Sequence, residues 1–235
     1  MKNVLIKESI VMFRNIFLMM TLVAFGFRSG MAGDEEKKNV MTNMKISNDK
    51  ITSLQAKMKQ RKTSSFMDNE VVSRAVFYYS KPGKYMLDPG NKEDNQYVIN
   101  GKEIWMINHK NKSVTITNDA ELNFSQYMMG IGNSMDVLET YFDVKVGPKK
   151  TEKKFNSFKM ELTPLKNGKL DGKFEKIVVL VRDDLWLPYG AELYENDGDT
   201  TVWEFTDFKI NQSIKEDLFK QEVPKGYTVK KYEKK

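Results

Sequence analysis

Residues 97–106 read YVINGKEIWM, and this stretch decides the fold class. Short runs of β-branched, aromatic and other apolar residues stand on either side of Asn100-Gly101. Asn and Gly tolerate the positive φ angles that a tight two-residue turn needs. The stretch therefore predicts two antiparallel strands joined by a hairpin turn.

Similar strands extend in both directions from this hairpin. Each is bounded by Gly, Asn, Asp or Pro, as antiparallel hairpins require. A slip in the apolar phase between Phe205 and Phe208 also predicts a β-bulge. The predicted strands cover residues 51–59, 71–80, 84–88, 96–100, 103–108, 113–117, 155–162, 175–182, 191–195, 201–210 and 226–232.

Three segments show helical spacing instead. Residues 33–50 place Val40, Met44 and Ile46 at loose helical spacing, which predicts a short amphipathic helix. Apolar residues at mixed spacings of three and four predict one or two short helices over 120–130 and 133–142. The expected fold is α+β and mainly antiparallel, with a long curved sheet and a few helices on its concave face.

The first 32 residues have the pattern of a secretory signal. Basic residues precede an apolar run from Ile16 to Phe27, and Gly30-Met31-Ala32 is a small-x-small motif. Cleavage is expected after Ala32, and Met12 is an alternative start. A retained membrane anchor is the other interpretation, but the run is too short at about 1.5 Å per residue to cross about 30 Å of hydrocarbon.

Composition narrows the class of protein further. The chain has no cysteine, which excludes disulfides and thiol chemistry, and an export signal without cysteine fits a bacterial periplasm. Removal of residues 1–32 lowers the formal net charge from +6 to +3, so charge does not favour a nucleic-acid-binding protein. Residues 33–235 show no repeat or linker and are expected to form one domain. The lysine-rich end, residues 230–235, is either solvated or in contact with anionic lipid.

No catalytic constellation is visible. His109, the one histidine, lies in a predicted loop and is interpreted as a solvated turn residue. Residues 195–199 faintly resemble a calcium loop but lack the later bidentate Glu, so a hairpin turn is the favoured interpretation. We therefore expect no enzyme activity, no cofactor and no metal.

Methionine is the most distinctive apolar residue of the predicted elements. Its unbranched, polarizable side chain repacks around ligands of variable shape. One interpretation is that these residues fill a core, and the second is that they line a lipid cavity. The residues concerned are Met58, Met86, Met106, Met128, Met129, Met135 and Met160.

A series of short motifs carries a family resemblance. They run from about residue 51 to the C-terminus, with a poorly matching middle between about 112 and 150. The motifs are Ser53-Leu54-Gln55-Ala56, YYSKPGKY at 78–85, NGKEIW at 100–105, Leu162-Thr163-Pro164, and Phe219 followed by PKGYTV at 224–229. In this order and spacing they resemble the LolA family of periplasmic outer-membrane lipoprotein carriers.

The resemblance implies an unclosed half β-barrel whose concave face, lidded by helices, holds the acyl chains of a lipoprotein. It implies a monomeric periplasmic chaperone that accepts lipoproteins from an inner-membrane ABC-type exporter. An outer-membrane receptor, where one exists, would take the cargo. The expected lipid-binding residues are Leu54, Met58, Phe77, Tyr79, Tyr85, Leu87, Ile104, Met106, Met128, Met129, Phe158 and Met160.

Departures from the family pattern point to one side chain. The family has an arginine before the turn proline, which helps to hold the lid and governs release, and this chain has Lys81 there. A lysine is a point donor to helix carbonyls or carboxylates, whereas arginine is a planar fork, so a looser latch is expected. Gln221 replaces the family's second Phe near the C-terminus.

Two other function classes stay open. A lipoprotein-sensing half-barrel module of an anti-sigma-factor regulator shares the expected architecture. A carrier of a different lipid, such as a glycolipid, would need the same apolar face.

Overall fold

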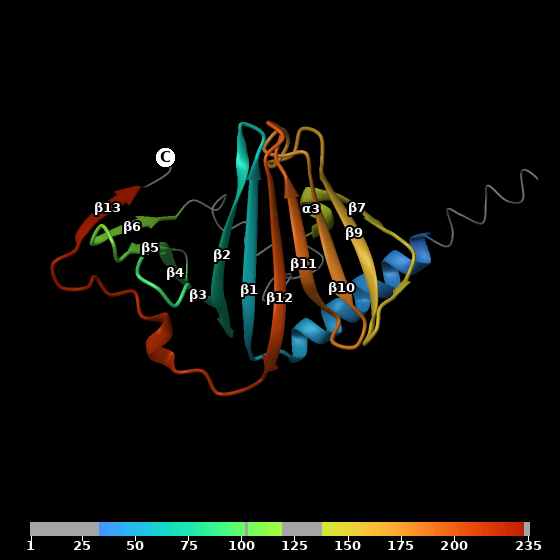
Figure 1. The fold of residues 1–235 in the computed structure, drawn as a ribbon. Coiled ribbons are helices and arrows are strands. Elements are labelled where there is room, and N and C mark those ends of the chain that lie inside the picture. The colour runs from blue at the N-terminus through green and yellow to red at the C-terminus, as the bar shows by residue number, and fades with distance from the viewer. Residues whose placement is uncertain (1–32, 102, 119–137, 233–235) are drawn as a thin grey trace, which may run out of the picture.

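A single 13-stranded sheet dominates the computed structural model, which describes residues 33–101, 103–118 and 138–232. Its strand order is β13-β6-β5-β4-β3-β2-β1-β12-β11-β10-β9-β7, and β8 pairs with β9 (Figure 1). The pairing of β13 with β6 is parallel, and the other pairings are antiparallel. The predicted class, a mainly antiparallel unclosed sheet with few helices, is confirmed.

The elements have the following bounds. The first six strands are β1 (Ser53–Ser64), β2 (Met67–Ser80), β3 (Lys84–Asp88), β4 (Asn95–Asn100), β5 (Glu103–Asn108) and β6 (Ser113–Thr117). The others are β7 (Phe142–Val146), β8 (Lys150–Thr151), β9 (Asn156–Pro164), β10 (Lys176–Arg182), β11 (Leu187–Tyr194), β12 (Thr200–Ile210) and β13 (Thr228–Tyr232). Residues 33–50 are helical, α3 is Leu138–Tyr141 and the 3-10 helix η2 is Glu216–Phe219.

The hairpin of β4 and β5 forms around Asn100-Gly101 as the sequence predicts. Gly101 has a φ of +80°, and Ile99 lies opposite Ile104 across the turn. Ile99 and Ile104 are buried on one face, while Val98 and Trp105 are buried on the other. These strands are therefore covered on both sides.

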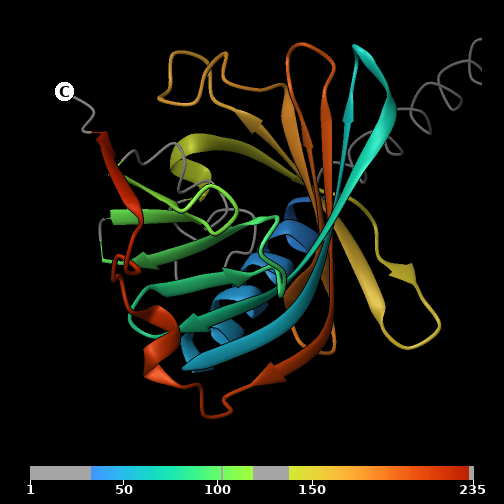
Figure 2. The same ribbon diagram turned by 60° about the vertical axis from the view of Figure 1, so that its left-hand side comes forward.

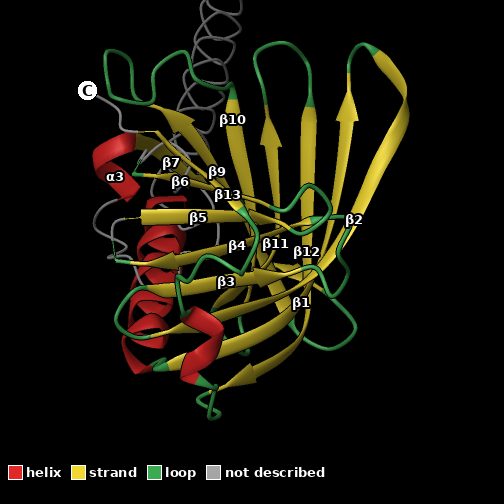
Figure 3. Ribbon diagram, turned by 90° about the vertical axis from the view of Figure 1, so that its left-hand side faces the viewer, coloured by secondary structure: helices red, strands yellow, loops and turns green. Residues whose placement is uncertain are grey.

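The helix of residues 33–50, called here the N-terminal helix, lies inside the curve of the sheet (Figures 2 and 3). Val40 and Met44 are buried in one cluster with residues of β7, β9 and β10. Of the three apolar residues that predicted this helix, Val40 and Met44 are buried and Ile46 is 46% exposed. The predicted amphipathic helix is confirmed, without Ile46 on its buried side.

The chain after β12 covers the opposite face of β3–β6. Phe219 of η2 is 1% exposed and packs in a second cluster with Val98 and Trp105. The Gln221 side chain donates to the carbonyl of Glu103 over 2.9 Å. This hydrogen bond therefore fastens the C-terminal segment to the β4–β5 hairpin.

His109 is not the solvated turn residue that the sequence suggested. It is half-buried, with Nδ1 2.9 Å from the Tyr227 hydroxyl and Nε2 3.1 Å from Gln96 Oε1. Tyr227 is too distant along the chain for a local pattern to reveal this contact. His109 joins the segment before β13 to the β4–β5 hairpin.

The expected helix over 133–142 is described only from residue 138 onward. Leu138–Tyr141 is helical as expected, but Phe142 begins β7, which pairs with β9. Phe142 and Val144 are buried while Asp143 and Lys145 are exposed, a period of two that competes with the helical spacing before it. The expected helix over 120–130 lies outside the described residues.

The predicted bulge in β12 is confirmed. The pairing with β1 shifts register opposite Thr206 to Lys209, and Asp207 has a φ of +55°. Among the described residues, no helix has the length and hydropathy needed to cross a bilayer.

Candidate functional site

A row of apolar side chains crosses five strands of the sheet. Leu54 lies opposite Tyr79, and Tyr79 lies opposite Tyr85. Tyr85 lies opposite Ile99, which in turn pairs with Ile104. Because paired residues of adjacent strands project from the same face, four of the expected lipid-binding residues share one face.

A second row runs beside the first. Phe77 lies opposite Leu87, Leu87 opposite Tyr97, and Tyr97 opposite Met106. The ring centroids of Phe77 and Tyr85 are 6.3 Å apart, so the two rows touch. Met58 packs in the same cluster as Phe77 and is 8% exposed.

The remaining described residues of the expected set lie under the N-terminal helix. Phe158 and Met160 of β9 are 2% and 1% exposed and pack with Val40 and Met44. Met160 lies opposite Val179, and the pairing continues through Ala191 and Trp203 to Gln60 of β1. They therefore share the face that bears Met58, while Met128 and Met129 lie outside the described residues.

Exposure divides this concave face into two parts. Phe158 and Met160 are sealed beneath the helix, whereas Leu87 and Met106 are half-buried. Tyr97 is 37% exposed and Val71 is 59% exposed on the same face. The apolar residues of this face are thus sealed at one side and accessible at the other.

Tyr79 and Tyr85 on this face are electrically neutral at ordinary pH. Burial raises the pKa of the Tyr79 hydroxyl, and burial together with the neighbouring Tyr79 raises the pKa of Tyr85. Their ring centroids are 5.2 Å apart. The two side chains act as apolar surface with a polar edge rather than as reactive phenolates.

Lys81 contacts the end of the N-terminal helix. Its Nζ donates to the carbonyl of Asp49 over 2.7 Å, and its backbone N–H donates to the carbonyl of Thr52 over 2.9 Å. The last carbonyls of a helix lack partners within the helix and carry partial negative charge, so a cation there is favourable. The expected donor to a helix carbonyl is present.

Asn211 makes a second fastening that the sequence analysis missed. Its Oδ1 accepts from the backbone N–H of Thr52 over 2.8 Å, and its Nδ2 donates to the carbonyl of Lys50 over 3.0 Å. Its φ of +56° lies in the left-handed region, which Asn tolerates. An Asn directly after a strand was the only signal, and its partners lie far away in sequence.

Polar side chains also join other parts of the helix to neighbouring segments. Ser47 Oγ donates to the carbonyl of Leu185 over 2.7 Å, near the C-terminal end of the helix. Towards the other end, Lys37 forms an ion pair of 2.7 Å with the half-exposed Glu139. The hydrogen bonds to the sheet are thus concentrated at the C-terminal end of the helix.

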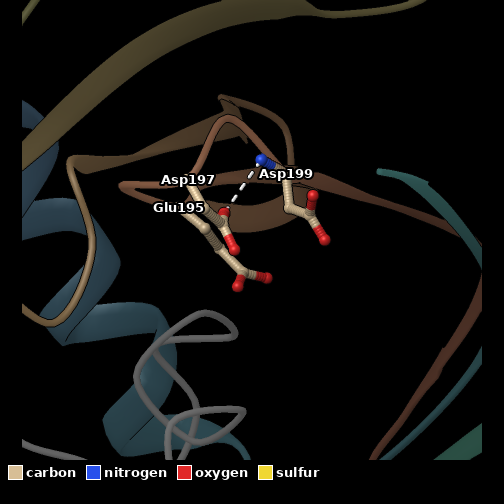
Figure 4. Close-up of side chains that lie close together, drawn as sticks. All are labelled: Glu195, Asp197 and Asp199. Carbon is tan, nitrogen blue, oxygen red and sulfur yellow. Dashed lines mark hydrogen bonds between the residues drawn. The ribbon is translucent and has the colours of Figure 1, made fainter. Parts of the chain in front are cut away.

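Three carboxylates meet at the β11–β12 turn (Figure 4). Glu195, Asp197 and Asp199 each offer an oxygen within 4.8 Å of the others. Asp199 Oδ1 already accepts from the backbone N–H and the hydroxyl of Ser65 over 2.9 and 3.3 Å, and from Ser64 Oγ over 2.9 Å.

These hydrogen bonds lower the pKa of Asp199 and fasten the turn to the tip of the β1–β2 hairpin. Lys62 Nζ lies 3.5 Å from both Glu195 and Asp199. The cluster lies in a hairpin turn, as predicted. Hydrogen-bond donors and a lysine of the protein itself contact its carboxylates.

Comparison with known proteins decides the family. The family model of the outer membrane lipoprotein carrier protein LolA matches residues 49–222. The chain belongs to the LolA family. This is a family of transport proteins rather than enzymes, in agreement with the missing catalytic constellation.

Several solved structures are similar to the chain at low sequence identity. An uncharacterized conserved protein from Thermus thermophilus has a TM-score of 0.54 at 13% identity, covering 84% of this chain and 99% of that one. A LolA superfamily protein from Nitrosomonas europaea has a TM-score of 0.41 at 12% identity, with coverages of 78% and 97%. The lipoprotein LppX from Mycobacterium tuberculosis has a TM-score of 0.42 at 10% identity, with coverages of 76% and 98%. No curated protein sequence matches the chain.

Proposed function

We propose that this LolA-family protein is a periplasmic chaperone that carries lipoproteins from the inner to the outer membrane. The observation that carries the proposal is the largely apolar concave face, sealed under the N-terminal helix and accessible around Tyr97 and Val71. Residues 1–32 act as a cleaved export signal, and residues 33–235 act as one monomeric carrier domain. An inner-membrane ABC-type exporter supplies the cargo, and an outer-membrane receptor, where the cell has one, accepts it.

The need for such a carrier follows from the cost of acyl chains in water. Each methylene transferred from water to an apolar surface contributes about 0.8 kcal/mol, so a lipoprotein anchor does not leave a membrane unaided. The half-buried Leu87 and Met106 and the exposed ring of Tyr97 offer the first contact surface. Met106 is flexible and repacks around chains of different length.

Release and uptake depend on the N-terminal helix. Hydrogen bonds from Lys81, Asn211 and Ser47 hold its C-terminal end. The ion pair of Lys37 with Glu139 is exposed, and such pairs contribute only about 0–1 kcal/mol. We infer that the helix swings outward about its C-terminal end, which separates Val40 and Met44 from the sheet and uncovers Met160 for more of the acyl chain.

Co-purification tests this function directly. The protein is isolated from the native periplasm under mild conditions, and bound lipids and peptides are identified by mass spectrometry. Acylated lipoprotein peptides are the expected result. Free glycolipid or phospholipid alone would make the protein a carrier of another lipid, and an empty protein in a strain with normal lipoprotein sorting would contradict the proposal.

A depletion strain separates a carrier from a lipoprotein-sensing module. Loss of a carrier leaves outer-membrane lipoproteins in the inner membrane, as membrane fractionation would show. A sensor would leave lipoprotein location unchanged.

A further inference from the structure

A lysine-rich hairpin joins β7 to β9. Residues 147–155 read GPKKTEKKF and are called here the basic arm. Within it, β8 pairs with β9 at Thr151 opposite Asn156, so the arm is folded back on the sheet. Figure 2 shows the arm, in yellow, projecting at the edge of the sheet.

The charge of this region is concentrated and poorly neutralised. Residues 143–159 contain six lysines and two acidic residues, a local net charge of +4 in a chain whose net charge is +6. Lys150 pairs with Glu152 over 2.9 Å, and Lys149 lies 3.8 Å from Asp183. Lys153 and Lys154 are exposed and have no ion-pair partner in the described ranges.

The base of the arm is held in a defined position. The Arg182 guanidinium lies 4.4 Å from the ring centroid of Phe155 and makes two 2.7 Å hydrogen bonds to Asp184. Asp183 accepts from the backbone and side chain of Asn156 over 2.9 and 2.8 Å. The carboxylates of Asp183 and Asp184 thus already accept hydrogen bonds at the base of the arm. They do not neutralise Lys153 and Lys154 further along it.

The two ends of the sheet differ in charge. Arg182 ends β10 beside the basic arm, whereas Lys176 at the other end of β10 pairs with Tyr194, next to the carboxylates of the β11–β12 turn. An approaching anionic surface therefore attracts the arm end first.

We propose that the basic arm docks the protein on an anionic phospholipid surface. The cores of protein interfaces are rich in aromatic residues and arginine and poor in lysine, and Phe155 is half-buried under Arg182. Lysines near an anionic bilayer each contribute about 1 kcal/mol by charge alone, without shape complementarity.

Protection of a sheet edge does not explain the arm. A lysine on an edge strand blocks unwanted pairing, and Lys150 on β8 suffices for that. Lys153 and Lys154 lie in the bend beyond β8. Docking goes beyond the proposed carrier function and holds whether or not the concave face binds acyl chains.

Co-sedimentation with vesicles tests the docking surface. The native protein is compared on vesicles of phosphatidylcholine alone and of phosphatidylcholine mixed with phosphatidylglycerol, at low and high salt. The arm variant carries Lys150→Gln, Lys153→Gln and Lys154→Gln. The matched control carries Lys92→Gln, Lys166→Gln and Lys169→Gln, which removes the same charge from exposed positions outside the arm.

We expect the native protein and the control to prefer anionic vesicles, and the arm variant to lose at least about tenfold of that preference. High salt should remove the preference from all three. The three proteins differ only at the substituted lysines, so the difference reports the arm. Equal losses in both variants would show a general charge effect and overturn the proposal. Absence of any preference for anionic vesicles in the native protein would overturn it too, and an arm-dependent complex with an acidic protein would then give the lysines a different partner.

Discussion

The two sides of the concave face carry similar apolar side chains but differ in how far these side chains are exposed to solvent. On β9, Phe158 and Met160 are sealed beneath the N-terminal helix, while on β3–β5 Leu87, Tyr97 and Met106 remain partly accessible. In an ordinary hydrophobic core, the apolar side chains on both sides would be equally buried. A face that is sealed at one side, by a helix whose hydrogen bonds to the sheet lie mainly at one end, is suited to reversible binding.

The largest loss of folding stability should come from truncating a side chain that is buried beneath the N-terminal helix. Met160→Ala removes a fully buried side chain and is expected to lower the free energy of unfolding by about 2–5 kcal/mol. Met106→Ala, on the accessible side, should cost about 1 kcal/mol or less. Urea denaturation measures both, and equal losses would mean that the two sides are packed alike.

The residues that the family resemblance marks as lipid-binding share one face, but the sequence did not show what covers them. Ten of the twelve expected lipid-binding residues are described, and they share one face because strand residues two apart point the same way. Which of them are sealed depends on where the N-terminal helix lies, and its buried residues Val40 and Met44 do not reveal their partners. Asn211 could not be recognised, because its partner Thr52 is 159 residues away.

Binding should respond most strongly on the accessible side. Tyr97→Glu places a charge on exposed apolar surface, and we expect the affinity for an acylated peptide to fall about tenfold, which is about 1.4 kcal/mol. Stability should change little at this exposed site. Titration with a fluorescent acyl peptide measures the affinity, and Val72→Glu on the opposite face is the control. Equal loss in both variants would contradict a specific acyl-binding face.

The fastened end of the helix can be loosened separately. Asn211→Gly keeps the positive φ but removes the side chain, so it should cost about 1–2 kcal/mol through the unpaired Thr52 and Lys50 groups. Amide hydrogen exchange should accelerate in residues 33–50 more than in β9. Uniform acceleration would show that Asn211 stabilises the whole sheet rather than the helix junction.

Acid should weaken both ends of the sheet. Hydrogen bonds from Ser65 and Ser64 lower the pKa of Asp199, and the hydrogen bond from Arg182 lowers the pKa of Asp184, from ordinary values of 3.8. A lowered folded-state pKa gives stability that is present above the unfolded pKa and lost as pH falls through the folded pKa. Stability should therefore be flat from neutral pH to about 5 and fall below about 4. Asp199→Asn should be less stable at neutral pH and less sensitive to acid, and an unchanged acid transition would contradict the role of this carboxylate.

The smallest expected effect concerns cargo release. Lys81→Arg replaces a point donor at the Asp49 carbonyl with a planar fork of donors, which should hold the helix more firmly. Transfer of a bound lipoprotein to acceptor membranes in a reconstituted assay should then slow. An unchanged rate would show that Lys81 does not control the helix.

Photo-crosslinking in cells tests the central claim, that the concave face binds lipoprotein acyl chains, most directly. A photoreactive amino acid at Tyr97 reports the accessible side of that face, and one at Val72, which is 43% exposed on the opposite face of the sheet, is the matched control. We predict crosslinks to acylated lipoproteins from position 97 and none from position 72. Equal crosslinking from both positions, or crosslinks from position 72 alone, would contradict it.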